Sequence, residues 1–183
     1  MPSPAAHTLF GLTCFHLLRA VLPGSGARTG TVTGFILLAS LAPDLDFVPG
    51  LILGDPSRYH QTLSHSLGGS FLIALVLGGA AWLWFSGVTG WRWIGLLPLF
   101  VLGHLFLDYF TEDRRPPIGF PMFWPFSDRL VISPVPVFPC LLRDPSLPGF
   151  WSHNLHTLLV EALILVPPWL VSRKLGTGRS NKP

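Results

Sequence analysis

The stretch His104-Leu-Phe-Leu-Asp108 lies near the end of a hydrophobic run that begins around Trp91. In a helix, residues four apart lie on one face, one turn above the other. An imidazole and a carboxylate placed in this way can hold one metal ion between them. A carboxylate in so apolar a segment is costly unless a partner compensates its charge. The alternative is a hydrogen bond between the two side chains that fixes a pair of helices, and this pair alone does not decide between the two.

The composition of the 183-residue chain is that of a membrane protein. Hydrophobic residues make up 49% of the chain and charged residues 11%, and the mean hydropathy is +0.52. Soluble domains average about 25% charged residues. The length indicates one domain. The net charge of +3 does not indicate nucleic acid binding, because the 12 basic residues form no patch with interleaved aromatic residues.

The hydrophobic pattern predicts an all-α fold, an integral membrane bundle of about four or five helices in one domain over residues 1–172. Helices are expected at 5–22, 31–42, 63–85, 92–111 and 155–172. The third is long enough to cross a bilayer. Pro43 and Pro49 flank two aspartates after the second helix, so that helix is predicted to be broken or unwound there.

Two segments outside the helices have a distinct composition. Residues 112–152 are rich in proline and aromatic residues and contain Gly119-Phe-Pro-Met-Phe-Trp-Pro-Phe126. This segment is not polar enough for a disordered linker, so we expect it to lie at the membrane interface or to fold over the bundle. Residues 173–183 are basic and are predicted to form a disordered tail.

Eight polar residues are expected to converge at one face of the membrane. If the helices alternate in direction, the starts of the first, third and fifth helices share a face with the ends of the second and fourth. All eight lie at such ends, at similar depth. They are His7, Asp44, Asp46, His60, His65, His104, Asp108 and Glu161.

These side chains predict a metal site. Imidazole and carboxylate donors suit zinc, manganese or iron, and zinc is the first expectation. Because eight residues exceed the three or four protein ligands of one catalytic zinc, either two ions bind, or one ion binds and some of the residues orient its ligands. Catalytic roles are assigned to Glu161, as a ligand or general base, and to Asp46, with a carboxylate taking a proton from metal-bound water. His16 is interpreted as a core or interface residue, and His153 and His156 are interpreted as loop or interface residues.

Several blocks of this sequence resemble the YdjM-type family of small bacterial and archaeal inner-membrane proteins, which are described as membrane-bound metal-dependent hydrolases. The resemblance covers about residues 5–127. The family's third block usually reads His-Arg-Gly-x-Thr-His-Ser; here Gln61, Thr62 and Ser64 replace Arg, Gly and Thr, while both histidines remain. The blocks are His7 with Gly11, Pro43-Asp-Leu-Asp46, His60-Gln-Thr-Leu-Ser-His65-Ser66, Gly103-His-Leu-Phe-Leu-Asp108-Tyr-Phe-Thr111 and Phe123-Trp-Pro-Phe126.

The site and the resemblance together predict a membrane-bound metal-dependent hydrolase that acts on a phosphoester or other ester of a lipid-like substrate. The inventory of ligands is also similar, more loosely, to that of zinc-dependent phospholipase C. The alternative is a metal-ion or proton transporter, because intramembrane His, Asp and Glu residues also mark ion pathways. A scaffold with a structural metal is a third possibility, although structural zinc sites usually use cysteine.

Overall fold

The computed structural model describes residues 1–21, 29–55, 59–84, 88–114 and 116–178, and these residues form an all-α bundle, as predicted. Within those ranges there is no strand, and Phe120 and Val131 form an isolated antiparallel bridge. The elements are α1 (Pro4–Val21), α2 (Thr29–Leu41), the 3₁₀ turn η1 (Ala42–Asp46), α3 (Phe47–Ile52), the 3₁₀ turn η2 (Leu63–His65), α4 (Leu67–Trp84), α5 (Val88–Tyr109) and α6 (Phe150–Gly178).

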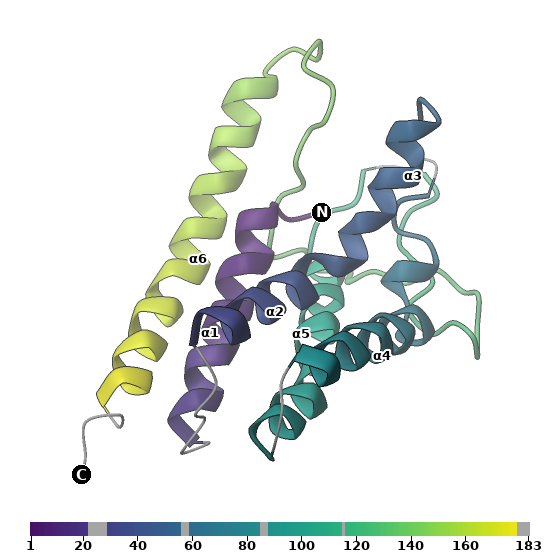
Figure 1. The fold of residues 1–183 in the computed structure, drawn as a ribbon. Helices are drawn as coiled ribbons and strands as arrows, with labels where there is room; N and C mark the ends of the chain where they lie inside the picture. The colour runs from purple at the N-terminus through teal and green to yellow at the C-terminus, as the bar shows by residue number, and fades with distance from the viewer. Residues whose placement is uncertain (22–28, 56–58, 85–87, 115, 179–183) are drawn as a thin grey trace.

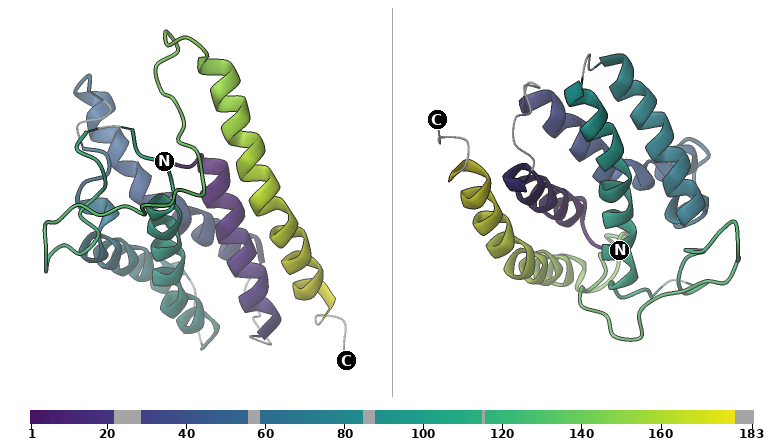
Figure 2. Two further views of the ribbon diagram at one scale, coloured as in Figure 1. Left: turned by 180° about the vertical axis from the view of Figure 1, so that it is seen from behind. Right: turned by 90° about the horizontal axis from the view of Figure 1, so that it is seen from below.

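The helices pack so that α1 and α5 lie at the centre of the bundle. α1 lies between α6 and α2, and α5 packs against α4, α2 and α1. Figure 1 and both views of Figure 2 show α1 and α6 side by side along their lengths. The start of α1 and the long irregular segment 110–149 lie at the same end of the bundle (Figures 1 and 2). The polar residues predicted to converge belong to this end.

The predicted break after the second helix is a tightening of the helix rather than an unwound segment. α2 continues through η1 into α3, and the backbone N–H of Phe47 bonds to the carbonyl groups of Asp44 and Leu45. Pro43 occupies the start of η1, where a missing N–H is tolerated. With about three residues per turn, side chains two apart in a 3₁₀ helix point in different directions. Asp44 and Asp46 therefore face different partners.

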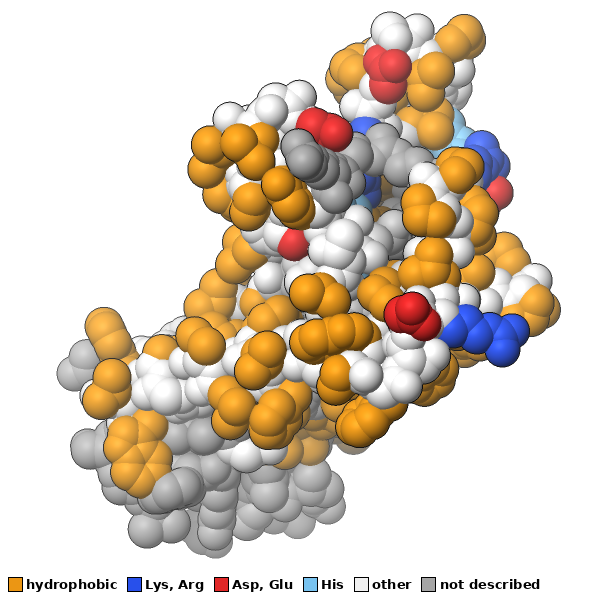
Figure 3. All heavy atoms as spheres, turned by 90° about the vertical axis from the view of Figure 1, so that its right-hand side faces the viewer, with side chains coloured by type: hydrophobic (Ala, Val, Ile, Leu, Met, Phe, Trp, Pro, Cys, Tyr) orange, Lys and Arg blue, Asp and Glu red, His pale blue; other side chains and the backbone are white. Residues whose placement is uncertain are grey.

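Three helical segments are long and apolar enough to cross a membrane: Gly30–Ile52, Leu67–Trp84 and Phe150–Gly176. The apolar part of α5, Gly95–Tyr109, is shorter. In the most apolar windows of the three long segments, only 33%, 28% and 22% of the residues are buried. The remaining apolar side chains are available to lipid, and Figure 3 shows them covering much of the face formed by α4.

Small residues let the central helices approach closely at the polar end. A Cβ atom on Gly11 of α1 would lie 2.2 Å from Ser40 Oγ of α2. A Cβ atom on Gly103 of α5 would lie 2.8 Å from the ring of Phe10 on α1. Three helices that carry predicted site residues therefore meet where a larger residue would separate them. Beyond this point the bundle is filled by an apolar core that includes Phe15, Ile36 and Phe100.

The segment 110–149 folds over the end of α4, which is one of the two arrangements expected for it. The backbone N–H groups of Leu67 and Gly68 donate to the carbonyl groups of Met122 and Trp124, at 2.8 and 2.9 Å. These bonds satisfy donors at a helix start that have no partner within the helix. Phe120 is fully buried, with its ring centroid 6.3 Å from that of His65.

The last helix is longer than predicted at both ends. α6 begins at Phe150 and continues to Gly178, so residues 173–178, which were expected to be disordered, are helical. Pro167 and Pro168 lie inside it without ending it. Residues 179–183 of the predicted tail lie outside the described residues.

Candidate metal centre

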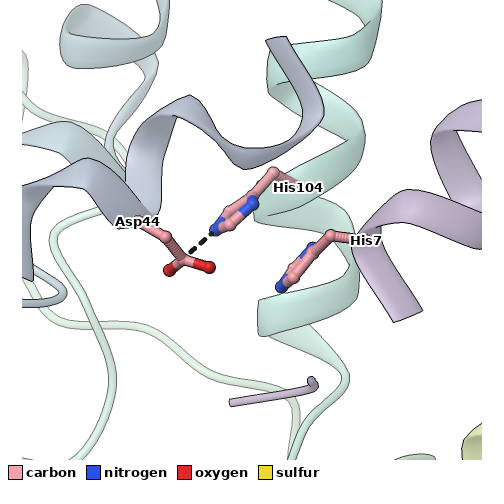
Figure 4. Close-up of side chains that lie close together, drawn as sticks. All are labelled: His7, Asp44 and His104. Carbon is pink, nitrogen blue, oxygen red and sulfur yellow. Dashed lines mark ion pairs between the residues drawn. The ribbon is translucent and has the colours of Figure 1, made fainter. Parts of the chain in front are cut away.

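The structure brings six of the predicted residues into one buried cluster. Three overlapping groups of side chains each have ligand atoms within 4.8 Å of one another. Figure 4 shows the first, in which His7 comes from α1, Asp44 from η1 and His104 from α5. Residues far apart in the sequence are thus joined at the end of the bundle. The groups are His7, Asp44 and His104; Asp44, His60 and His65; and His65, His104 and Asp108.

Four atoms at the centre of the cluster have the separations of ligands around one metal ion. His65 Nε2 and His104 Nε2 lie 3.3 Å apart. Asp108 Oδ2 is 3.3 and 3.2 Å from these two nitrogens, and Asp44 Oδ1 is 3.5 Å from each. Two atoms that each bind a tetrahedral zinc ion at about 2.0–2.1 Å are about 3.3 Å from one another. The measured separations therefore fit a zinc-sized ion among these atoms.

Hydrogen bonds at Nδ1 leave Nε2 as an acceptor in three histidines, and in His65 and His104 this atom faces the central ligand atoms. His104 Nδ1 donates to the carbonyl oxygen of Ser40 at 2.8 Å, and His60 Nδ1 donates to Asp46 Oδ1 at 2.7 Å. Ser64 Oγ donates to Asp46 Oδ2 at 2.6 Å, so it accepts from His65 Nδ1 at 3.0 Å. A neutral imidazole with its proton on Nδ1 has an acceptor at Nε2. This is the arrangement that holds metal-ligating histidines.

Other ligand atoms of the cluster receive no hydrogen bond within the described part of the chain. No hydrogen-bond partner among the described residues reaches either ring nitrogen of His7, Oδ1 of Asp44 or either carboxylate oxygen of Asp108. All three side chains lie in the buried cluster, and Asp108 is 1% exposed. A buried ionised carboxylate without compensation is strongly unfavourable. The cluster therefore fits a cation, which would satisfy all three residues together.

His7 and His60 lie on opposite sides of the central four atoms. His7 Nε2 is 3.7 Å from Asp108 Oδ1, and its ring stacks on that of His104 with centroids 3.7 Å apart. His60 stacks on Phe47 with centroids 3.9 Å apart and presents Nε2 next to the sulfur of Met1. Each of the two histidines also groups with Asp44. They are available to complete one site or to take part in a second.

The electrostatic environment differs between the two histidines outside the membrane-spanning helices. Burial lowers the pKa of His60 despite its hydrogen bond to Asp46. Burial also acts to lower the pKa of His65, but the neighbouring carboxylates of Asp44, Asp46 and Asp108 outweigh it, and the pKa is raised. The negative field that favours a proton on His65 also favours a metal ion, because the two compete for the same nitrogen.

Asp46 was predicted as a ligand and catalytic residue, but the structure gives it a different position. Its two oxygens accept bonds from His60 Nδ1, Ser64 Oγ and, at 3.2 Å, the backbone N–H of Gln61. It also lies 3.1 Å from His65 Nδ1. Asp46 thus holds two histidines from the side that faces away from the central atoms. The reason is the 3₁₀ turn, which points Asp46 and Asp44 in different directions.

Glu161 was predicted as a ligand or general base, and the structure places it outside the cluster. Oε1 accepts the backbone N–H of Ser3 at 2.6 Å, and Oε2 accepts the Ser3 hydroxyl. Ser3 Oγ in turn accepts the backbone N–H of Ala6 at 3.1 Å, which makes Ser3 the N-cap of α1, with Pro4 following. Glu161 of α6 therefore completes the cap of α1, one turn before His7.

Sequence reasoning missed the residues that orient the ligands. The Ser40 carbonyl carries no signal in the sequence, because any residue supplies one. Nothing in the local sequence pattern predicts the hydrogen bond from Ser64 to Asp46. His153, which was expected to be structural, donates from Nε2 to the Cys140 carbonyl at 2.8 Å. His16 contacts Phe15, at 5.4 Å between ring centroids, and His156 is exposed.

Comparison with known proteins agrees with the long apolar helices that this is a membrane protein. A family model described as YdjM inner membrane protein matches residues 1–175. No curated protein and no solved structure matches the chain. The match extends beyond the blocks around residues 5–127 and includes α6.

Proposed function

The chain belongs to the YdjM family of inner membrane proteins, and from this premise we propose that it is a metal-dependent hydrolase that cleaves a phosphoester of a lipid or of another membrane-partitioned compound. The observation that carries the proposal is the set of buried ligand atoms on His7, Asp44 and Asp108 that have no hydrogen-bond partner among the described residues. A buried cluster kept only for stability is expected to satisfy its polar groups internally.

The residues that would hold the ion are Asp44, His65, His104 and Asp108. A bound zinc, manganese or iron ion would supply Lewis acidity and lower the pKa of water. The donor set contains no thiolate, which is typical of catalytic rather than structural zinc sites. The Ser40 carbonyl and Asp46 fix the histidines, so the ligands need not reorganise when an ion or substrate binds.

His7 and His60 are the residues available for handling a proton or a second ion. Neither ring nitrogen of His7 has a hydrogen-bond partner in the described part of the chain, and Nε2 lies 3.7 Å from Asp108 Oδ1. An imidazole next to a carboxylate can accept a proton from water and keep it near the reacting centre. Glu161, with both oxygens bonded to Ser3, is not proposed for this role.

A transporter of metal ions or protons is the second candidate, because the polar groups lie in or beside apolar helices. Transport needs a polar path that continues beyond the cluster. The core that follows it along the bundle is apolar and includes Ile36, Leu97 and Val101. This packing favours a closed site that opens at one end, and therefore hydrolysis over transport.

The first test is the metal content of the detergent-purified protein, measured by mass spectrometry with His104→Ala alongside. We expect one or two equivalents of a transition metal in the wild type and loss of the metal from the variant. A wild type without metal, even after loading, would mean that imidazolium–carboxylate ion pairs hold the cluster, and the hydrolase proposal would fail.

The second test is a substrate panel with the metal-loaded protein. Phospholipids, lysophospholipids and model phosphodiesters are incubated with zinc, manganese or iron, and products are detected by mass spectrometry. Cleavage by the wild type but not by Asp108→Asn would support the proposal. If every substrate stays intact and zinc enters proteoliposomes that contain the protein, transport replaces hydrolysis.

A further inference from the structure

A cavity of about 260 Å³ lies beside the metal centre, between the start of the chain and the segment 110–149. Its polar lining includes Gln61, Asp113, Arg114, Arg143 and Asp144. Residues 140–142 and Leu147 supply an apolar part. Figure 3 shows a recess at this end of the molecule in which basic and histidine side chains are visible. A polar mouth with an apolar wall suits an amphipathic ligand.

The cavity is next to the cluster through two of its lining residues. Gln61 follows His60 directly in the chain. The sulfur of Met1 lies against His60 Nε2, and the Met1 carbonyl accepts the backbone N–H of Leu141 at 3.2 Å. The side chain of Met1 is thus the group that separates the cavity from His60. Because an unbranched thioether side chain adapts easily, a ligand can displace it.

Arg143 is the charged residue best placed to bind a ligand here. Its Nη2 donates to the sulfur of Met1 at 2.9 Å, and its guanidinium carbon lies 4.5 Å from the centroid of the Phe47 ring. The ring of Phe47 also stacks on that of His60, with centroids 3.9 Å apart. Phe47 therefore contacts both the guanidinium of Arg143 and the imidazole of His60.

The other charges of the lining are engaged by groups of their own. Arg114 Nε donates to Glu112 Oε1 at 2.8 Å. Asp144 Oδ1 accepts from the backbone and hydroxyl of Ser146, at 2.9 and 2.6 Å, and Asp113 Oδ2 accepts from Gly119 at 2.7 Å. These bonds hold the loops that form the walls. Two of the contacts of Arg143, with the sulfur of Met1 and the ring of Phe47, bind a guanidinium more weakly than a phosphate oxygen does.

We propose that this cavity is the phosphate subsite of the proposed hydrolase, with Arg143 as the residue that binds the anionic head group beside His60. The inference rests on the proposed function in one respect, which is that the bond to be cleaved lies at the metal centre. The binding of phosphate in the cavity does not depend on that function. A planar guanidinium fork can bond two phosphate oxygens at once. The ligand class is a phosphate monoester or diester, and its source is either a lipid head group or a water-soluble phosphate.

The test measures phosphate binding rather than turnover. Binding is monitored by ³¹P NMR titration of the purified, zinc-loaded protein. The probes are inorganic phosphate, glycerol 1-phosphate and a short-chain phosphatidylglycerol. The variants are Arg143→Ala, Arg143→Lys and, as a matched control from an exposed loop position, Arg129→Ala. Metal content and thermal unfolding are measured on the same samples.

We expect at least one probe to bind the wild type, with affinity reduced at least tenfold in Arg143→Ala and unchanged in Arg129→Ala. Arg143→Lys should lie between them, because lysine keeps the charge but not the fork. Tighter binding of phosphatidylglycerol than of glycerol 1-phosphate would assign the site to lipid head groups. Equal binding of the two probes would assign it to soluble phosphates.

The inference is overturned if no probe binds, or if all variants bind every probe equally. In the second case the anion is held by the metal ion alone. Because metal content is measured separately, a protein that holds metal but shows no effect of Arg143 removes the subsite and leaves the metal centre intact. If the protein binds phosphate through Arg143 but holds no metal, the subsite stands and the proposed metal centre fails.

Discussion

Asp108 and Glu161 are both buried carboxylates in apolar helices, yet the protein treats them differently. Asp108 on α5 is 1% exposed and Glu161 on α6 is 3% exposed. Both oxygens of Glu161 accept hydrogen bonds from Ser3. Neither oxygen of Asp108 has a hydrogen-bond partner among the described residues, although His65 and His104 nitrogens lie 3.3 and 3.2 Å away.

The comparison teaches that a carboxylate in an apolar helix is not by itself a sign of chemistry. Both residues are costly to bury, and both were predicted to belong to the site for that reason. The difference is the source of compensation. Backbone and hydroxyl donors solvate Glu161 fully, whereas Asp108 faces nitrogens that have their own protons turned away. The unsatisfied oxygens of Asp108 support its proposed role as a metal ligand, whereas the satisfied oxygens of Glu161 support a structural role.

The largest effect is expected from Asp108→Asn. An amide cannot replace an anionic ligand, so this variant should lose nearly all bound metal, measured by mass spectrometry after purification. The metal-free variant should nevertheless unfold at the same or a higher temperature than the metal-free wild type, because an uncompensated buried charge is removed. A fall in stability together with full metal content would reverse the assignment of Asp108.

A smaller effect on metal is expected from Asp46→Asn. Asp46 orients His60 and His65 through their Nδ1 atoms without facing the central atoms. Loss of such an orienting carboxylate reduces metal affinity by about 10–100-fold. Competition with a chelator of known affinity should show this shift, with metal still bound at saturation. Loss of all metal at saturation would make Asp46 a ligand, as the sequence first suggested.

The fold and most of the cluster were predictable from the sequence because they depend on short-range patterns. Hydrophobic runs locate the helices, and alternating direction brings helix ends to one face. That argument correctly placed His7, Asp44, His60, His65, His104 and Asp108 together. It could not separate them from Asp46 and Glu161, because direction and depth along a helix say nothing about rotation around it.

The remaining features depend on contacts that no local pattern encodes. The 3₁₀ geometry of residues 42–46 sets the different directions of Asp44 and Asp46. The pairing of Glu161 with Ser3 joins residues at opposite ends of the sequence. Arg143 lies in a segment without helices, so its approach to Phe47 follows from the path of an irregular chain. Such contacts require the three-dimensional structure.

Two glycines of α4 test whether the close packing of its backbone against η2 holds the metal-site residue His65 in place. A Cβ atom on Gly69 would lie 1.8 Å from the Leu63 carbonyl oxygen in η2, whereas one on Gly79 would have no atom within 4 Å. Gly69→Ala should therefore displace η2 with His65, destabilise the protein by about 1–3 kcal/mol and weaken metal binding. Gly79→Ala should stabilise it by about 0.5–1 kcal/mol. Thermal unfolding in detergent measures both, and equal effects of the two would show that the close approach does not hold His65.

The smallest effect on metal content is expected from Glu161→Gln, which changes the second of the two compared carboxylates. Glutamine keeps one acceptor oxygen for Ser3 but loses the charge and the second acceptor, so the free energy of unfolding should fall by about 1–2 kcal/mol. Because the bonds of Glu161 end at the cap of α1, metal content and chelator competition should match the wild type. Ser3→Ala is the matched control, since it removes the same hydroxyl bond from the opposite partner. If Glu161→Gln loses metal while Ser3→Ala keeps it, Glu161 acts on the metal directly. The presence or absence of hydrogen bonds to the carboxylate oxygens would then not distinguish Glu161 from Asp108.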